Sequence, residues 1–260
     1  MNRSSDLSAE RYRAPALDKG LDILELLAAS EVPLTQAEIA KALDRTPNEI
    51  YRMLDRLVRR QYVLRMGSDR YELTLRMFAL AHQHAPIRRL IAQALPELRD
   101  FARTAKQAGH IAIYQRGDVV VLEQVDSPGY WGFSIRVGSR VHLYNTGSGH
   151  VLLAFASDRE RAFMIEEHEL MPAESRPPDL NHRLDEVRKR GYEMMPSLQS
   201  VGVLNLSVPV FGPSGTVVAA LTCPYMTRHD ETAPEPLAAV DMLRRAAQRI
   251  EPAAGGRSVR

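Results

Sequence analysis

Residues 34–74, LTQAEIAKALDRTPNEIYRMLDRLVRRQYVLRMGSDRYELT, decide the fold of the N-terminal part of this chain. Two helix starts lie within this stretch. Thr35 with Glu38, and Thr46 with Glu49, have the spacing of a capping box, in which a hydroxyl and a carboxylate satisfy each other's backbone N–H groups. The stretch therefore predicts two short helices in close succession.

A tight turn at Asp44-Arg45 separates these helices. Pro47 occupies the first position of the second helix, where its missing N–H costs nothing. The segments 62–66 and 70–74 then have the pattern of two strands, and Gly67-Ser68-Asp69 between them is typical of a turn. Two helices across a tight turn, followed by a β-hairpin, predict a winged helix-turn-helix.

Arginine is concentrated in this region. Residues 45–70 hold seven arginines against three acids, a net charge of +4, whereas the whole chain carries only +2. Arginine neutralises phosphates, which supplies most of the sequence-independent affinity of proteins for DNA. An ordinary helical domain with a solvated charged face is the alternative, but the combination with a wing favours binding of double-stranded DNA.

The residues expected to contact DNA lie at the two helix starts, on the outward side of the second helix and in the hairpin: Thr35, Gln36, Arg45, Thr46, Asn48, Glu49, Tyr51, Arg52, Arg56, Arg65 and Arg70. Asn48 and Glu49 lie in the first turn, the part of a recognition helix that enters the major groove, so they are expected to contact bases. Glu49 has a competing role as the capping partner of Thr46. Arg52 and Arg56 are expected to contact phosphates.

The composition is that of a folded soluble protein. The chain has 260 residues, of which 45% are hydrophobic and 25% charged. No apolar run approaches the roughly 18 residues of a membrane span, and the polar N-terminus does not have the apolar segment of a signal peptide. The single cysteine, Cys223, excludes an internal disulfide and fits a reducing compartment. We therefore expect a cytoplasmic protein.

The sequence divides into five segments. We expect a disordered tail over 1–13, the DNA-binding domain over 14–74, a linker helix over 75–85, a larger domain over 86–251 and a loose C-terminus over 252–260. The first helix, 14–29, should bury an apolar stripe made of Leu17, Leu21, Leu24, Leu27 and Ala28. The larger domain is predicted to be α+β, with about six mostly antiparallel strands at 110–114, 119–124, 133–137, 192–198, 203–210 and 216–223.

The strand 203–210 alternates cleanly, so Asn205 and Ser207 share one face. That face is either a solvated side of the sheet or the polar floor of a pocket. Thr222 in the next strand is a weaker candidate for the same pocket. Trp131 either closes over an apolar ligand or belongs to the core or a subunit contact.

Residues 146–149 open a helix, with Thr146 as its N-cap. Gly147 and the following residues leave backbone N–H groups uncovered, which together with the helix dipole attract a carboxylate. Asn145 and Ser148 are placed to add hydrogen bonds. The alternative is a tight turn that needs glycine for its conformation alone.

No catalytic or metal-binding pattern stands out. The serine in Gly147-Ser148-Gly149 lies directly between its glycines, unlike a nucleophile elbow, and the Gly-Lys-Ser/Thr end of a phosphate-binding loop is missing. The pairs His82/His84 and His142/His150 could bind a metal, but neither has a cysteine nearby or a helical His-Glu-x-x-His frame. We therefore expect no enzyme activity, cofactor or metal. An enzyme acting on a small organic acid, with a DNA-binding-like accessory domain, and a sensor that binds only proteins remain the alternatives.

Four stretches together resemble the IclR family of bacterial transcription regulators: PALDKGLDILELL (15–27), LTQAEIAKALDRTPNEIYRMLDRL (34–57), VGSRVHLYNTGSGHVLLAF (137–155) and GYEMMPSLQSVGVLNLSVPVFGPSGTVVAALTCPYM (191–226). The resemblance implies a winged helix-turn-helix joined by a linker helix to a GAF-like effector-binding domain. It also implies a homodimer or homotetramer and a small organic acid as effector. The chain departs from the family at Asn48-Glu49, where small hydroxyl residues are usual, at His150, where lysine is common, and at Asn205, where cysteine is common.

The sequence therefore predicts a transcription regulator whose affinity for a near-palindromic operator is controlled by a small carboxylate. The ligand is expected between the helix start at 146–149 and the face of Asn205 and Ser207. The effector signal is expected to pass through the helix at 87–107 to the linker helix.

Overall fold

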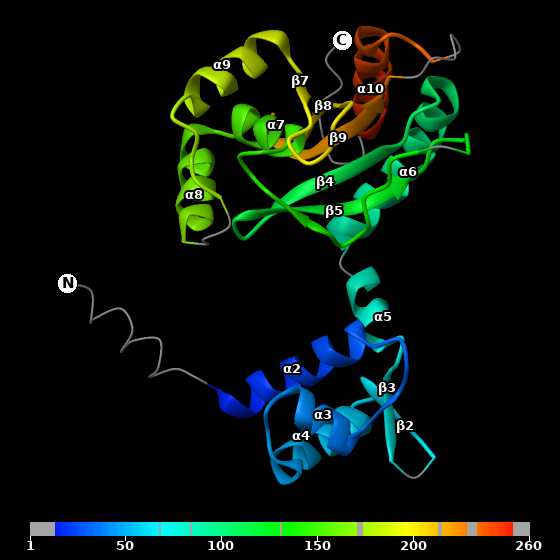
Figure 1. Cartoon of the computed structure of the whole chain (residues 1–260). Coiled ribbons are helices and arrows are strands. Elements are labelled where there is room, and N and C mark those ends of the chain that lie inside the picture. Colours follow the sequence, from blue (N-terminus) through cyan, green and yellow to red (C-terminus); the bar gives the residue numbers. More distant parts are fainter. Residues whose placement is uncertain are drawn as a thin grey trace, which may run out of the picture. The chain divides into compact units, whose positions relative to one another are not determined.

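The computed structural model describes residues 14–251 except 68, 84, 131, 171–173, 213–214 and 228–232, and it describes only the backbone of residues 81 and 82. The chain separates into two compact units, Met1–His84 and Ala85–Arg260 (Figure 1). The predicted tail over 1–13, the C-terminus over 252–260 and Trp131 lie outside the described residues.

The N-terminal unit is a winged helix-turn-helix. Its elements are α2 (Pro15–Ala29), β1 (Leu34–Thr35), α3 (Gln36–Ala42), α4 (Pro47–Arg59), β2 (Val63–Met66), β3 (Arg70–Leu73) and α5 (Arg76–Gln83). The strands form an antiparallel sheet in the order β1-β3-β2, in which β2 and β3 are the predicted wing and β1 is an addition that the sequence did not indicate.

The core of the N-terminal unit is small, and the predicted buried stripe of α2 is wrong in part. Its buried residues are Ile23, Leu24, Leu27, Ile39, Ala40, Ile50, Leu54, Val63 and Tyr71. Leu17 and Leu21, which were predicted to belong to the buried stripe of α2, are 62% and 45% exposed. The seven residues of α3 and three short strands provide too little surface to cover the whole length of α2. The first turns of α2 therefore leave apolar side chains on the surface.

The C-terminal unit is α+β, as predicted. Its elements are α6 (Ala85–Ala105), β4 (Gly109–Gln115), β5 (Asp118–Val125), β6 (Arg140–Val141), α7 (Gly147–Phe155), α8 (Asp158–Glu169), α9 (Leu180–Arg190), β7 (Glu193–Pro196), β8 (Val203–Phe211), β9 (Val217–Met226) and α10 (Pro236–Ile250). The sheet is antiparallel in the order β6-β5-β4-β9-β8-β7.

The predicted strand over 133–137 does not form. These residues join no strand ladder, and the edge of β5 pairs instead with the two residues of β6. Phe133 and Ile135 alternate as in a strand because both line a cavity, described below, rather than because they belong to the sheet.

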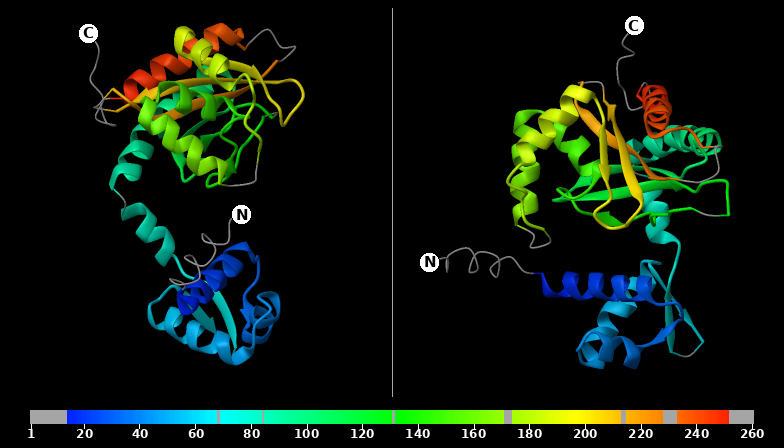
Figure 2. Two further views of the ribbon diagram at one scale, coloured as in Figure 1. Left: turned by 90° about the vertical axis from the view of Figure 1, so that its left-hand side faces the viewer. Right: turned by 45° about the horizontal axis from the view of Figure 1, so that its top comes forward.

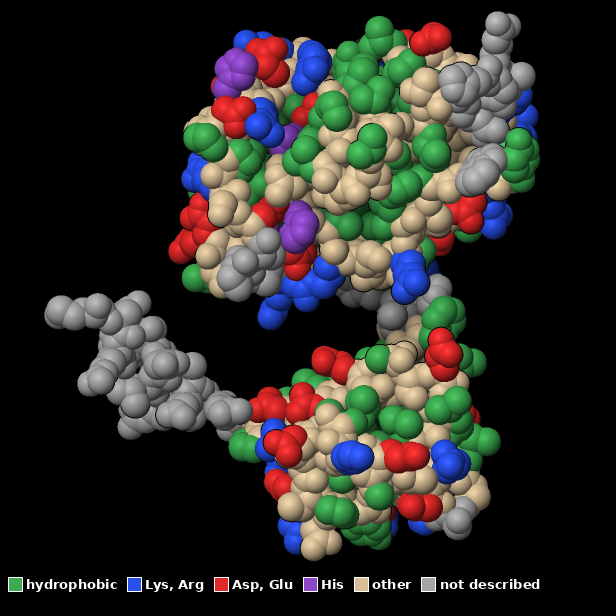
Figure 3. All heavy atoms as spheres, viewed as in Figure 1, with side chains coloured by type: hydrophobic (Ala, Val, Ile, Leu, Met, Phe, Trp, Pro, Cys, Tyr) green, Lys and Arg blue, Asp and Glu red, His purple; other side chains and the backbone are tan. Residues whose placement is uncertain are grey.

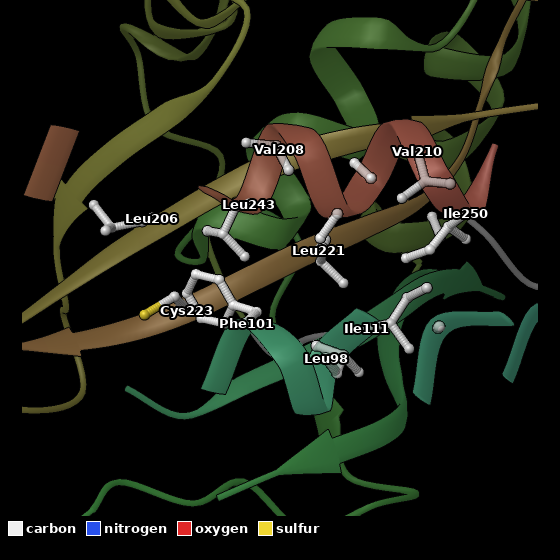
Figure 4. Close-up of a cluster of buried hydrophobic side chains, with 14 of the residues drawn as sticks. Leu98, Phe101, Ile111, Leu206, Val208, Val210, Leu221, Cys223, Leu243 and Ile250 are labelled. Carbon is white, nitrogen blue, oxygen red and sulfur yellow. The ribbon is translucent and has the colours of Figure 1, made fainter. Parts of the chain in front are cut away.

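Helices cover both faces of this sheet. In Figure 2, α6 and α10 lie on one side and α7 lies on the other with α8 and α9. Figure 4 shows the layer between the sheet and α10, in which Leu206, Val208 and Val210 of β8 meet Leu243 and Ile250. The alternate residues of β8 face α7.

Cys223 belongs to the same hydrophobic layer. Its side chain is fully buried, and burial raises the pKa of the thiol, so it remains protonated and unreactive. Among the described helices, none combines the length and the apolar character needed to cross a membrane.

Candidate functional site

The start of α4 is held by a network centred on Glu49. Its carboxylate accepts hydrogen bonds from the backbone N–H (3.1 Å) and the hydroxyl (2.9 Å) of Thr46. It also accepts one from Nζ of Lys19 on α2, at 2.6 Å. Lys19 and the two bonds from Thr46 lower the pKa of Glu49 to about 2. These contacts favour its capping role over base contact, because the carboxylate is already engaged.

The outward side of α4 is free to meet a partner. Asn48, Tyr51, Arg52 and Arg56 are exposed, and the structure gives none of them an ion pair with a described residue. Arg59, in contrast, pairs with Asp55 one turn earlier in the same helix. The residues of α4 predicted to contact DNA thus lie together on one accessible surface.

Three other predicted DNA contacts have structural roles of their own. Thr35 caps α3 by accepting a hydrogen bond from the N–H of Glu38. The amide of Gln36 donates to the carbonyl oxygen of Pro47, at 2.9 Å, and so fixes α3 against the start of α4. Arg70 donates to the carbonyl oxygen of Pro33, at 2.8 Å, and thereby holds the wing.

The two remaining arginines predicted to contact DNA lie at the surface. Arg45 is exposed in the turn between α3 and α4. Arg65 is exposed on β2, with its guanidinium 5.8 Å from the centre of the Tyr71 ring. Charged side chains of both signs are spread over the visible face of both units, with hydrophobic ones among them (Figure 3).

A cavity of about 300 Å³ lies at the start of α7. Five of the predicted effector-binding residues line it: Thr146, Gly147, Ser148, Asn205 and Thr222. Asn145 and Ser207 lie outside the lining. The predicted site is thus assembled from α7, β8 and β9.

Eight further residues, which were not predicted, line the cavity. The apolar ones are Phe133, Ile135 and Val141, and the polar ones are His110, Arg140, His142, Ser197 and Gln199. They come from the strands β4 and β6, from the segment over 133–137 and from the loop after β7, which meet only in the folded chain. The lining contains an arginine and no carboxylate.

The floor of the cavity is tied together by hydroxyl groups. Thr222 Oγ1 lies 2.8 Å from Ser148 Oγ and 2.8 Å from Ser207 Oγ, and all three residues are buried. Ser207 thus has its predicted orientation, but it supports Thr222 from outside the lining. The face is covered by α7 and is not solvated.

The start of α7 lies very close to its neighbours. Thr146 caps the helix by accepting a hydrogen bond from the N–H of Gly149, at 3.1 Å. A Cβ on Gly147 would lie 3.2 Å from Cβ of Asn205, and one on Gly149 would lie 2.7 Å from the carbonyl carbon of Leu143. Glycine is needed at 147 so that the first turn, whose N–H groups have no partner within the helix, can approach β8, and at 149 so that the helix can pass the backbone of Leu143.

Two buried histidine–glutamate pairs hold the residue before this helix start. The backbone oxygen of Tyr144 lies 2.7 Å from Nε2 of His150, whose Nδ1 lies 2.6 Å from Glu193. The N–H of Tyr144 donates to Glu174, at 2.6 Å, and Glu174 lies 3.0 Å from Nε2 of His168. His150 thus joins Glu193 to the backbone just before α7 through its two ring nitrogens.

His110 on β4 is a buried histidine that lines the cavity. It is 3% exposed, and burial lowers its pKa to about 4, so the ring is neutral near pH 7. Arg140, another lining residue, donates from Nε to Asp118 at 2.6 Å. Among the described residues, no cluster of three or more metal-ligating side chains occurs.

Two family descriptions match the chain. Residues 16–66 match the IclR helix-turn-helix domain, and residues 82–251 match the C-terminal region of the bacterial transcriptional regulator IclR. The chain belongs to the IclR family. It is therefore a transcriptional regulator of that family with a DNA-binding helix-turn-helix.

Relatives and solved structures agree with this assignment. The chain is 28% identical over 230 residues to the transcriptional regulator KdgR of Escherichia coli, a match that covers 86% of this chain and 87% of that protein. It is 29% identical over 213 residues to the transcriptional regulator BhcR of Paracoccus denitrificans. This match covers 80% of this chain and 76% of BhcR.

The fold is that of solved IclR structures. The match to the Thermotoga maritima IclR covers 94% of this chain and 100% of that protein's chain, with a TM-score of 0.73 and 23% sequence identity. An IclR homolog of Microbacterium hydrocarbonoxydans, complexed with 4-hydroxybenzoate, matches 92% of this chain and 98% of its own, with a TM-score of 0.75 and 22% identity.

Proposed function

We propose that this regulator binds a near-palindromic operator as a homodimer or homotetramer, and that a small carboxylate in the cavity at α7 controls its affinity for DNA. The cavity at the start of α7 carries the proposal, because it joins an open helix N-terminus to a polar floor within a regulator of transcription. Acting on DNA, the protein would work in the cytoplasm.

The chemistry of the lining favours an anion. The first turn of α7 offers backbone donors and the positive end of its dipole. Ser148 and Asn205 add side-chain donors, and the lining contains no acid. Arg140 also lines the cavity, with its guanidinium paired to Asp118. The cavity volume lies at the lower end of the range for small-molecule sites. A ligand of the size of a hydroxybenzoate, as bound by the Microbacterium homolog, fits that range.

Binding of the carboxylate must favour one arrangement of the DNA-binding domains over another, because a ligand shifts an equilibrium only through unequal affinity for its states. We propose that α6 carries the shift, since it packs on the sheet and begins where the second unit begins. Exposed apolar side chains on the N-terminal unit, Leu17 on α2 and Leu75 just before α5, are the proposed subunit contacts.

The DNA-binding surface is tested by salt dependence. Fluorescence anisotropy with DNA from upstream of the gene should show that Arg52→Ala and Arg56→Ala each lower affinity. Each should also reduce the slope of log affinity against log salt by about 0.9 per lost phosphate contact. Arg103→Ala, at an exposed arginine of the other unit that pairs with Asp100, is the matched control and should leave both quantities unchanged. Wild-type slopes in both α4 variants would refute the assignment.

Base contact is tested separately at Asn48. Asparagine makes paired hydrogen bonds to adenine in the major groove, so Asn48→Ala should change the base preference of selected binding sites more than the stability of the fold. Identical selected sites for the variant and the parent would remove Asn48 from the set of base-contacting residues.

The effector site is tested by Asn205→Leu. The substitution removes a polar partner from the cavity and leaves the DNA-binding unit intact. We expect the variant to bind DNA as the parent does, but to lose the response to a carboxylate effector. A response at an unchanged effector concentration would place the effector site elsewhere.

A further inference from the structure

An ion pair joins α2 of the DNA-binding unit to the first turn of α4. Nζ of Lys19 lies 2.6 Å from Oε1 of Glu49, although the two residues are 30 positions apart in the sequence. The pair forms because α2 packs against α4 in this unit (Figure 1). Both side chains are only partly exposed, 22% for Lys19 and 38% for Glu49. A residue of α2 thus contacts the part of α4 that is expected to meet the bases.

The carboxylate of Glu49 accepts three hydrogen bonds. Lys19 donates to Oε1, and the backbone N–H and the hydroxyl of Thr46 donate to Oε2. An ionised carboxylate offers about four acceptor positions, so little capacity remains for a base. The pKa of Glu49 is lowered to about 2, chiefly by the hydrogen bond from Lys19, so the carboxylate is charged near pH 7.

A charged carboxylate in the first turn of α4 would have two effects on DNA binding if it were free. The first turn of a recognition helix enters the major groove, where the negative charge is repelled by the phosphates. In the same place a carboxylate accepts a hydrogen bond from the amino group of cytosine, which changes the base preference. Lys19 opposes both effects, because it supplies the opposite charge and occupies Oε1 of Glu49.

We propose that Lys19 determines the DNA sequence preference without contacting DNA. It keeps the carboxylate of Glu49 neutralised and engaged, so that the neighbouring exposed Asn48 meets the bases instead. The backbone of this turn has a second support, since the amide of Gln36 donates to the carbonyl oxygen of Pro47 at 2.9 Å. Loss of Lys19 would therefore free Oε1 of Glu49 while the turn itself stays in place. The inference rests on the proposed DNA-binding surface of α4 and adds a positioning residue from α2.

Binding-site selection and a double-mutant cycle on the full chain test the inference. Sites are selected from a random duplex library, and fluorescence anisotropy measures affinity for the duplex that the wild type selects. Lys19→Met keeps the apolar stem and removes the charge, so it should weaken binding about tenfold and enrich cytosine at one position of the half-site. Glu49→Gln keeps an oxygen for Thr46 without the charge. In that background, Lys19→Met should change affinity by less than about twofold and should not enrich cytosine.

Three controls accompany these variants. Lys19→Arg keeps a charged donor and should retain the parent's base preference. Lys189→Met removes the lysine of a comparable ion pair in the other unit, with Glu186 at 2.9 Å, and should leave affinity and selected sites unchanged. The melting temperature of Lys19→Met should stay close to that of the wild type, because a partly exposed ion pair contributes little to stability.

Unchanged affinity and unchanged selected sites in Lys19→Met would overturn the inference alone. An equal loss of affinity in both backgrounds, with the slope of log affinity against log salt reduced by about 0.9, would also overturn it, because Lys19 would then contact a phosphate directly. A marked fall in melting temperature with an equal loss of affinity for every duplex would leave Lys19 a structural role only. Parental affinity and salt slope in both Arg52→Ala and Arg56→Ala on the same duplex would overturn the proposed DNA-binding surface, and this inference with it.

Discussion

Thr222→Val should destabilise the C-terminal unit far more than its size suggests. The substitution removes one hydroxyl and nearly preserves the shape of the side chain. That hydroxyl links Ser148 on α7 to Ser207 on β8 through two hydrogen bonds of 2.8 Å each, with all three residues at most 2% exposed. Valine therefore breaks both bonds and deprives two buried hydroxyls of a partner.

The expected cost is about 2–4 kcal/mol in the free energy of unfolding, from two hydrogen bonds of about 1 kcal/mol each plus the desolvation of the hydroxyls left behind. Hydrogen exchange of the β8 and β9 amides, together with urea unfolding, measures this cost in the unit concerned. In a double-mutant cycle, Thr222→Val and Ser148→Ala should cost less together than the sum of the two, by about 1 kcal/mol, because they remove the same bond. Strict additivity, or a cost of Thr222→Val below about 0.5 kcal/mol, would refute the hydroxyl chain; DNA affinity without effector should not change.

Gly149→Ala should abolish effector binding in calorimetry and lower stability by about 3 kcal/mol, because its Cβ would lie 2.7 Å from the carbonyl carbon of Leu143, a backbone atom that cannot swing aside; a variant with the parent's melting temperature and affinity would contradict this. His110 has a folded pKa of about 4, below the unfolded value of about 6.5, so the unfolded state binds more protons between these values and stability is lost as pH falls through them. Urea titrations should therefore show a loss in the wild type that exceeds the loss in His110→Phe by roughly 3 kcal/mol, and parallel pH profiles would count against a neutral buried ring. Leu75→Glu, at a side chain that is 80% exposed, should shift sedimentation towards the monomer with unchanged circular dichroism, and an unaltered oligomer would remove this surface from the subunit contact.

Local signals in the sequence predicted local structure well. The pair Thr35–Glu38 forms a capping box because its partners are three residues apart, within one helical turn. The alternation over 203–210 correctly separated the two faces of β8, since the side-chain period of a strand is fixed by its backbone. The same rule was wrong for 133–137, because alternation shows that alternate side chains are buried but not that a partner strand lies alongside.

Contacts between distant residues were not predictable. His150 and Glu193 are separated by 43 positions, and only the packing of α7 beside β7 brings them together. His110 lies in an ordinary strand pattern, and nothing near it in sequence indicates that its Nδ1 has no partner. Five of the eight predicted effector residues line the cavity. Five of the missed ones, Arg140, Val141, His142, Ser197 and Gln199, lie in the same stretches 137–155 and 191–226, so these stretches located the site without singling out all of its residues.

The alternation along the strands also has an evolutionary consequence. On β4, β8 and β9, the residues that face α7 alternate with residues such as Ile111, Leu206 and Leu221, which belong to the hydrophobic layer under α6 and α10. The two sets share a backbone but few side-chain neighbours, so substitutions in one set are nearly additive with those in the other. At the proposed effector site, selection could therefore change the chemistry of the ligand through two or three positions on one face, such as His110 and Asn205, while the opposite layer, which packs against α6 and α10, is inherited intact. A regulator with this arrangement could come to bind a different effector while the packing of α6 and α10 on the other face of the sheet stays the same.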